Sequence, residues 1–126
     1  MILIVEDNPR NRKLMKIMLQ SQGYTIAEAV DGETGLDRLT TGPVDLVVLD
    51  IQLPGISGLD VARTARAREA TKATPILAVT AFAQSADRES ALAAGCTAYM
   101  TKPIEMQAFL AEVARLLDTR ENAEAA

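Results

Sequence analysis

Five short apolar runs alternate along this chain with longer segments of helical pattern, and this alternation limits the fold more than any other feature of the sequence. Runs that are apolar throughout are typical of parallel strands covered on both faces. Repeated strand–helix units with right-handed crossovers then predict an α/β fold, a doubly wound (βα)5 arrangement around a five-stranded parallel sheet. The apolar runs are Met1–Val5, Tyr24–Ala29, Val44–Leu49, Pro75–Thr80 and Ala98–Thr101.

The segments between the runs carry the start and stop signals of helices. Asn8-Pro9 is an N-cap followed by proline at the first helical position, and Gly23 ends the helix that follows. Asp31 and Ser57 are the expected N-caps of the second and third helices. The five expected helices extend over residues 8–23, 31–40, 57–70, 85–94 and 106–117.

The length of 126 residues suits one domain with a real core, and we expect that domain over residues 1–118. The polar, alanine-rich tail 119–126 is expected to fray. No apolar run approaches the roughly 20 residues that span a bilayer, no signal-peptide pattern is present, and Cys96 is the single cysteine. These features predict a cytoplasmic protein that does not insert into membranes.

Charge and composition exclude several classes of function. The net charge of −4, without a basic stripe, argues against nucleic-acid binding. The chain has no histidine, so it can form neither a Ser-His catalytic pair nor a histidine-ligated metal site.

Polar residues follow four of the apolar runs at the point where each run stops. Because the carboxyl ends of parallel strands share one edge of the sheet, these residues are expected to meet in one crevice. Carboxylates crowded together favour a hard cation such as Mg²⁺, which relieves their repulsion. Asp50 is the candidate nucleophile toward a phosphoryl group, and Lys102 would neutralise the phosphoryl charge. The residues of this crevice are Glu6, Asp7, Asp50, Thr80 and Lys102.

Each of these residues also has a purely structural explanation when it is taken alone. Asp50 could be a turn or cap residue, and Glu6-Asp7 could serve the dipole of the following helix. Thr80 could be an ordinary strand residue and Lys102 a solvated surface lysine. The joint placement at one sheet edge is what favours the functional interpretation.

Six stretches of the chain, read in order, resemble the receiver domain of two-component response regulators, over roughly residues 1–118. Any one stretch alone is a weak signal, but their order and spacing are specific. Further detail around residues 51–54, 80–83 and 95–99 is most similar to the DivK-type single-domain cell-cycle regulators. The six matching stretches are Leu3–Asn8, Asp45–Asp50, Leu53–Gly58, Ala78–Ala81, Ala94-Gly95 and Lys102-Pro103.

The resemblance implies a phosphorylation chemistry. The counterpart of Asp50 accepts a phosphoryl group from a phosphohistidine on a sensor histidine kinase or a histidine phosphotransfer protein. The counterparts of Glu6, Asp7 and Asp50 bind Mg²⁺ together with the backbone carbonyl of Gln52. Lys102 matches the lysine that binds the phosphoryl group.

The resemblance also implies a switch. Thr80 matches the hydroxyl that moves toward the phosphoryl group, and Tyr99 matches the aromatic residue that turns inward with it. The Lys102–Pro103 peptide bond is expected to be cis, and Gln52 and Phe82 occupy positions that tune the lifetime of the acyl phosphate. A downstream protein partner is expected on the face formed by the fourth helix, the fifth strand and the fifth helix.

We therefore predict a single-domain response regulator rather than a turnover enzyme. A constitutive scaffold with the same fold and a receiver excised from a larger kinase or regulator remain as alternatives. A phosphohydrolase is disfavoured because Gln52 stands where such enzymes place a second aspartate. A flavodoxin-like module is disfavoured because the first strand leads into acids instead of a phosphate-cradling loop. Basic residues early in the first helix, Arg10, Arg12 and Lys13, form either a docking face for the phosphodonor or a solvated patch.

Overall fold

The structure, a computed structural model, describes residues 1–81 and 85–125, with side chains described for residues 1–81 and 86–118. In this part of the chain, strands and helices alternate without exception. The elements in chain order are β1 (Ile2–Val5), α1 (Pro9–Gln20), β2 (Ile26–Ala29), α2 (Gly32–Thr41), β3 (Leu46–Asp50), α3 (Gly58–Ala67), β4 (Ile76–Thr80), α4 (Ser85–Ala93), β5 (Ala98–Thr101) and α5 (Met106–Ala125).

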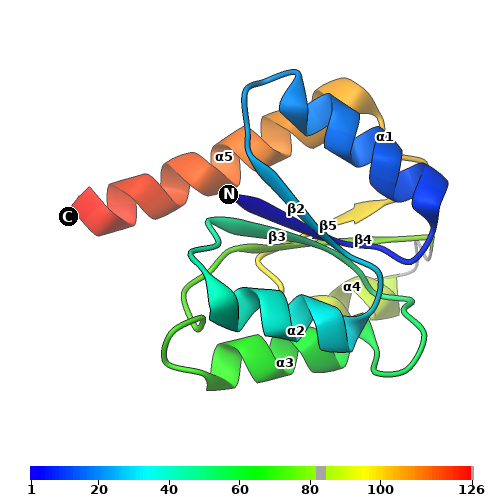
Figure 1. Cartoon of the computed structure of the whole chain (residues 1–126). Helices are drawn as coiled ribbons and strands as arrows, with labels where there is room; N and C mark the ends of the chain where they lie inside the picture. Colours follow the sequence, from blue (N-terminus) through cyan, green and yellow to red (C-terminus); the bar gives the residue numbers. More distant parts are fainter. Residues whose placement is uncertain (82–84, 126) are drawn as a thin grey trace.

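The strands form one parallel sheet in the order β2-β1-β3-β4-β5. Helices α1 and α5 cover one face, and α2, α3 and α4 cover the other (Figure 1). The predicted doubly wound, five-stranded parallel sheet is therefore confirmed. Chain order reverses between β1 and β3, and this reversal opens a crevice at the carboxyl edge of the sheet.

Each face of the sheet has its own hydrophobic core. Successive residues of β1 point to opposite faces, so Leu3 and Val5 join one core while Ile2 and Ile4 join the other. Phe109 of α5 is completely buried in the second core. Burial on both faces explains why the strands are apolar throughout, with no alternation of polar residues.

The predicted N-caps are confirmed. The side chain of Asn8 accepts hydrogen bonds from the backbone N–H groups of Arg10 and Asn11 at the start of α1. Asp31 and Ser57 cap α2 and α3 in the same way. Because these caps use backbone donors that a helix leaves unpaired, they fix where each helix leaves the sheet edge.

Two helix ends differ from the prediction. Helix α3 ends at Ala67 instead of near residue 70, because Arg68 adopts an extended backbone conformation and the Thr71 hydroxyl donates to the carbonyl of Ala65 at 2.6 Å. Helix α5 continues to Ala125, through most of the tail that was expected to fray. Alanine and glutamate have high helix propensities, and both are frequent in that segment.

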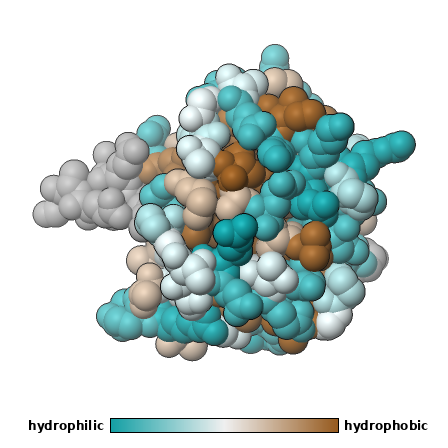
Figure 2. Space-filling model, viewed as in Figure 1, coloured by the Kyte–Doolittle hydropathy of each residue, from teal (hydrophilic) through white to brown (hydrophobic). Residues whose placement is uncertain are grey.

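The outer surfaces of the helices are mainly polar. Hydrophilic residues dominate the face shown in Figure 2, and hydrophobic residues appear there as separate spots. Within the described residues, no helix combines the length and the apolar character that crossing a membrane requires.

Arg66 ties together the edge of the sheet opposite the crevice. Its guanidinium donates to the carbonyls of Thr74 at 2.6 Å and Gly95 at 2.8 Å, and to the Thr97 hydroxyl at 3.1 Å. Gly95 has a positive φ of 110°, and a Cβ there would lie 2.5 Å from the Arg66 side chain. One side chain thus links α3 to the segments that enter β4 and β5, a role that the sequence pattern did not reveal.

Replacing this arginine should destabilise the fold. We expect Arg66→Ala to lower the free energy of unfolding by about 2–4 kcal/mol, because several carbonyls lose a charged donor. Urea denaturation followed by circular dichroism measures the change.

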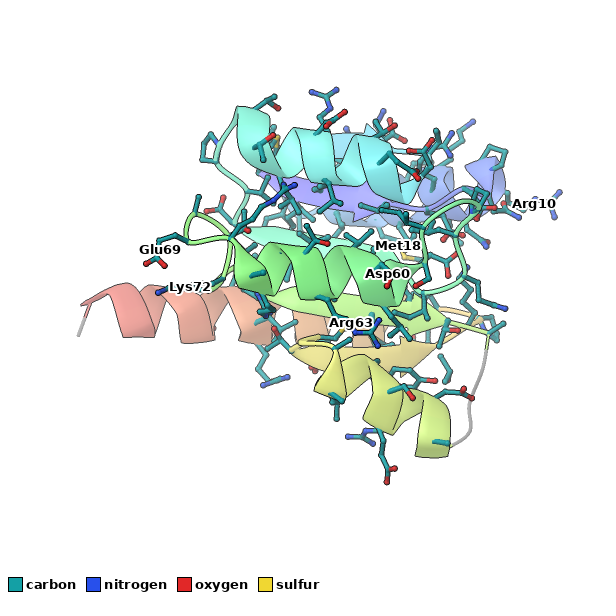
Figure 3. The ribbon with its side chains drawn as sticks, turned by 90° about the horizontal axis from the view of Figure 1, so that it is seen from below. Arg10, Met18, Asp60, Arg63, Glu69 and Lys72 are labelled. Atoms are coloured by element: carbon teal, nitrogen blue, oxygen red, sulfur yellow. The ribbon has the colours of Figure 1, made fainter. Side chains whose placement is uncertain are left out.

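Arg63 provides a matched control on the same helix. It is exposed and forms an ion pair with Asp60, one turn earlier, on the outer face of α3 (Figure 3). Arg63→Ala should change the free energy of unfolding by less than about 0.5 kcal/mol, as is usual for an exposed ion pair. Equal effects of the two substitutions would contradict the structural role of Arg66.

Candidate functional site

The carboxyl edge of the sheet gathers the predicted acids and the lysine. Glu6 directly follows β1, Asp50 is the last residue of β3, and Lys102 directly follows β5. Carboxylate oxygens of Glu6, Asp7 and Asp50 lie within 4.8 Å of one another. Because β1 and β3 are paired in the sheet, residues 44 positions apart in the chain become neighbours in space.

Glu6 is completely buried at the base of this cluster. Its Oε1 accepts hydrogen bonds from Lys102 Nζ at 2.9 Å and from Asn11 Nδ2 at 3.1 Å. Its Oε2 is buried and has no hydrogen-bond partner among the described residues. Burial raises the pKa of this carboxyl to about 7, and the neighbouring carboxyl of Asp50 adds to the effect, which Lys102 and Asn11 only partly offset.

Asp50 is also buried, with 2% of its surface exposed. Its Oδ1 accepts a hydrogen bond from the backbone N–H of Gln52 at 2.9 Å, and its Oδ2 accepts one from Lys102 Nζ at 3.2 Å. The two carboxylate oxygens therefore have different surroundings, one turned to the backbone and the other to the ammonium. The side chain of Gln52 is exposed beside them.

Lys102 is the cation that the two buried acids share. Burial lowers the pKa of its ammonium, but hydrogen bonds and charge from Glu6 and Asp50 outweigh that effect, so the pKa stands above its usual value. The following peptide bond, Lys102–Pro103, is cis. The backbone N–H of Lys102 donates to the carbonyl of Thr80 at 2.7 Å, which joins the ends of β4 and β5.

The residues of the expected switch lie on β4 and β5. Thr80 ends β4, one residue beyond the partner of Asp50 in the sheet register, and it is buried. Tyr99 on β5 packs against the first core. Burial raises the pKa of the Tyr99 hydroxyl, and the charge of Asp87 on α4 raises it further. Strand β5, which carries Tyr99, contacts α4. Phe82, expected to tune phosphate lifetime, lies outside the described residues.

The basic residues of α1 divide into two groups. Arg12 is turned inward, because its Nη1 donates to the backbone carbonyl of Glu6 at 3.0 Å and its Nε lies 3.4 Å from Oε1 of Glu28. Arg10 and Lys13 are exposed. Figure 3 shows Arg10 at the periphery of the molecule, pointing away from it. Arg12 therefore does not share the exposed surface of Arg10 and Lys13.

Gly58 is a site residue that the sequence presented only as part of a helix cap. A Cβ at this position would lie 2.3 Å from the backbone oxygen of Asp50 and 2.6 Å from the Cα of Ile51. The backbone of α3 therefore approaches the end of β3 so closely at residue 58 that only glycine fits there. This contact fixes the short segment that carries Gln52.

The residues present fit a hard divalent cation. Three carboxylates supply the oxygen ligands that Mg²⁺ prefers, and Glu6 Oε2 is a buried acceptor with no donor among the described residues. The residues that could hold the ion are Glu6, Asp7 and Asp50, with the backbone carbonyl of Gln52 as a further candidate. An ion in this position would also lower the repulsion between the acids.

Comparison with known proteins gives one consistent result. The family model of the response regulator receiver domain matches residues 2–114. The polar-differentiation response regulator DivK of Brucella ovis is 38% identical over 109 residues, which cover 86% of this chain and 89% of that protein.

Solved structures agree with this result. The receiver domain of the sensor histidine kinase PA1611 from Pseudomonas aeruginosa, with a magnesium ion coordinated in its active-site cleft, is 34% identical with a TM-score of 0.87. The matched region covers 93% of this chain and 96% of the PA1611 receiver domain. A CheY-like receiver domain protein from Methanospirillum hungatei is 27% identical with a TM-score of 0.90, covering 97% of this chain and 96% of its own.

Mg²⁺ should stabilise the protein in a pH-dependent manner. Because the pKa of Glu6 is raised to about 7, this carboxyl is mostly protonated at pH 6, and the ion must displace that proton. We expect 10 mM MgCl₂, roughly the scale that saturates a millimolar site, to raise the Tm several degrees more at pH 8 than at pH 6. Differential scanning fluorimetry measures both shifts.

The metal-free protein supplies the control for the direction of this pH dependence. The pKa of Glu6 is about 7 in the folded protein, above the usual 4.5, so the folded state holds the proton more tightly than the unfolded state does. The stability that this proton gives is fully present below pH 4.5 and is lost as the pH rises through about 7. Glu6→Gln removes this titration, so in EDTA the variant should gain Tm relative to the wild type between pH 5 and pH 8. Equal Mg²⁺ shifts at pH 6 and pH 8 would show that Glu6 does not titrate in this range.

Proposed function

Because this chain belongs to the response regulator receiver domain family of two-component signalling, we propose that it accepts a phosphoryl group on Asp50 and signals through that modification. The single observation that carries the proposal is the buried cluster in which Lys102 bridges Glu6 and Asp50 beside Asp7. A nucleophilic carboxylate, a metal-binding acid set and a fixed cation together form a phosphoryl-transfer site.

The transfer we propose starts from a phosphohistidine on a sensor histidine kinase or a histidine phosphotransfer protein. A carboxylate oxygen of Asp50 forms the new O–P bond while the P–N bond breaks. The electron pair of that bond stays on the imidazole nitrogen, which takes a proton from water. The product is an aspartyl phosphate, so the domain is itself the substrate, and its role is regulatory and not that of a turnover enzyme.

Each residue of the cluster has one task in this step. Mg²⁺, when bound by Glu6, Asp7 and Asp50, offsets the negative charge of the acids and of the incoming phosphoryl group. The ammonium of Lys102, already 3.2 Å from Asp50 Oδ2, binds a phosphoryl oxygen after transfer. The backbone N–H of Gln52 holds Asp50 Oδ1 and so orients the carboxylate.

The effect of phosphorylation is transmitted from the site through β4 and β5. A phosphorylated Asp50 carries up to two negative charges and strong acceptor oxygens, which attract the hydroxyl of Thr80. Tyr99, on the neighbouring strand β5, then changes its position, and β5 contacts α4. We propose that a downstream protein partner recognises the resulting change on the face formed by α4, β5 and α5.

Intact-mass spectrometry tests phosphorylation directly. After incubation with acetyl phosphate and Mg²⁺, the wild type should gain the mass of one phosphoryl group, about 80 Da, by the stoichiometry of one nucleophile. Asp50→Ala and an EDTA-treated wild type should gain none. Asp60→Ala, which removes an exposed acid of α3, should gain the same mass as the wild type.

Two further outcomes would contradict the proposal, and one would restrict the phosphodonor. A gain that persists in Asp50→Ala would place the acceptor elsewhere. No gain from acetyl phosphate, but a gain from a phosphorylated histidine phosphotransfer domain, would show dependence on a protein donor. No gain from either donor would favour the constitutive scaffold.

A further inference from the structure

Asn11 contacts the metal-binding acid set from a position that the proposed chemistry does not use. It lies in the first turn of α1 and is half-buried. Its Nδ2 donates a hydrogen bond of 3.1 Å to Oε1 of Glu6, the same oxygen that accepts from Lys102 at 2.9 Å. Two donors from opposite ends of the chain thus converge on one carboxylate oxygen and leave Oε2 without a donor among the described residues.

The local structure fixes both partners of this hydrogen bond. The Asn8 cap accepts from the backbone N–H of Asn11 at 3.1 Å, so the helix start that carries the amide is anchored. Arg12 donates to the backbone carbonyl of Glu6 at 3.0 Å, so the residue that carries the carboxylate is held as well. With both backbones held, the amide of Asn11 and the ammonium of Lys102 together orient the Glu6 carboxylate.

Asn11 differs from Lys102 in what else it can bind. Lys102 is shared between Glu6 and Asp50, and it is the group expected to engage a phosphoryl oxygen once Asp50 is modified. Asn11 is neutral, and Glu6 is the acid that its amide contacts. When Lys102 turns to the phosphoryl group, Oε1 of Glu6 would keep its donor only through Asn11, and a buried carboxylate without donors is costly.

We propose that Asn11 is a positioning residue for the metal site. It holds Oε1 of Glu6 so that Oε2 faces the cation, and it preserves this orientation when Lys102 is drawn to the phosphoryl group. The second part of this proposal rests on the proposed function, whereas the first part concerns metal binding alone. Mutation of a hydrogen-bond partner of a metal ligand commonly weakens metal binding by about 10-fold to 100-fold.

An open space beside Asn11 bears on the choice of variants. It has a volume of about 360 Å³ and is lined by Asn11, Leu14 and Lys102 among others, so residue 11 borders open volume on one side. Asn11→Leu removes the amide at similar size, and Asn11→Gln retains an amide on a longer arm. Leu14, which lines the same cavity and is 46% exposed, supplies the control Leu14→Ala.

Isothermal titration calorimetry with MgCl₂ at pH 8 is the first measurement. Asn11→Leu should raise the Kd for Mg²⁺ by about tenfold, Asn11→Gln should recover most of the affinity, and Leu14→Ala should stay within about twofold of the wild type. The Tm of each variant in EDTA reports folding separately. An unchanged Kd in Asn11→Leu, or an equal loss in Leu14→Ala, would overturn the proposal.

A double-mutant cycle with Lys102→Ala tests whether Asn11 affects Mg²⁺ binding through the shared oxygen, Oε1 of Glu6. If Asn11 and Lys102 both act on Oε1, Asn11→Leu should weaken Mg²⁺ binding by a larger factor in the Lys102→Ala background, where no donor then remains. Equal factors in the two backgrounds would mean that Asn11 acts independently of that oxygen and would overturn the proposal.

Phosphorylation by acetyl phosphate, measured by intact mass, separates this proposal from the proposed function. If the wild type gains a phosphoryl group but Asn11→Leu binds Mg²⁺ normally, the proposed function stands and the role of Asn11 fails. If no chain gains a phosphoryl group from acetyl phosphate or from a phosphorylated histidine phosphotransfer domain, but Asn11→Leu weakens Mg²⁺ binding, the role of Asn11 in metal binding stands and the proposed function fails.

Discussion

The shared hydrogen bonds of Lys102 to Glu6 and Asp50 are the interaction on which the rest of this structure depends. Two carboxylates buried side by side repel by about 4 kcal/mol at 4 Å with an effective dielectric constant near 20. One ammonium between them offsets that repulsion, and removing one partner of such a buried set costs about 3–5 kcal/mol. The fold can therefore keep two buried carboxylates side by side only while the end of β5 stays near the ends of β1 and β3.

The sheet order meets this requirement. Because β1 lies between β2 and β3, and β4 separates β3 from β5, the crevice opens beside the point where chain order reverses. The segments that follow β1 and β3 are held by contacts with the helices after them. Asn8 caps the helix after β1, and Gly58 brings α3 against the backbone of Asp50. The acids of the candidate metal site thus lie at or close to the ends of regular strands.

Strands β4 and β5 are held at both ends by different contacts. At the amino edge of the sheet, Arg66 links α3 to the segments entering β4 and β5. At the carboxyl edge, the backbone N–H of Lys102 donates to the carbonyl of Thr80 and joins the two strand ends. Thr80 ends β4, and β5, which carries Tyr99, contacts α4.

The sequence by itself determined the class of fold and most of the site. Apolar runs without alternation required a sheet covered on both faces, and the polar residues that end those runs had to share one edge. Glu6, Asp50, Thr80 and Lys102 could be predicted because parallel topology alone brings them together. Only the tertiary structure decided which side chains orient these residues. Asn11, Arg12 and Gly58 lie only a few positions along the chain from the residues they contact, Glu6 and Asp50. Whether their atoms meet depends on the direction in which each helix leaves the end of its strand, and no sequence pattern encodes that direction.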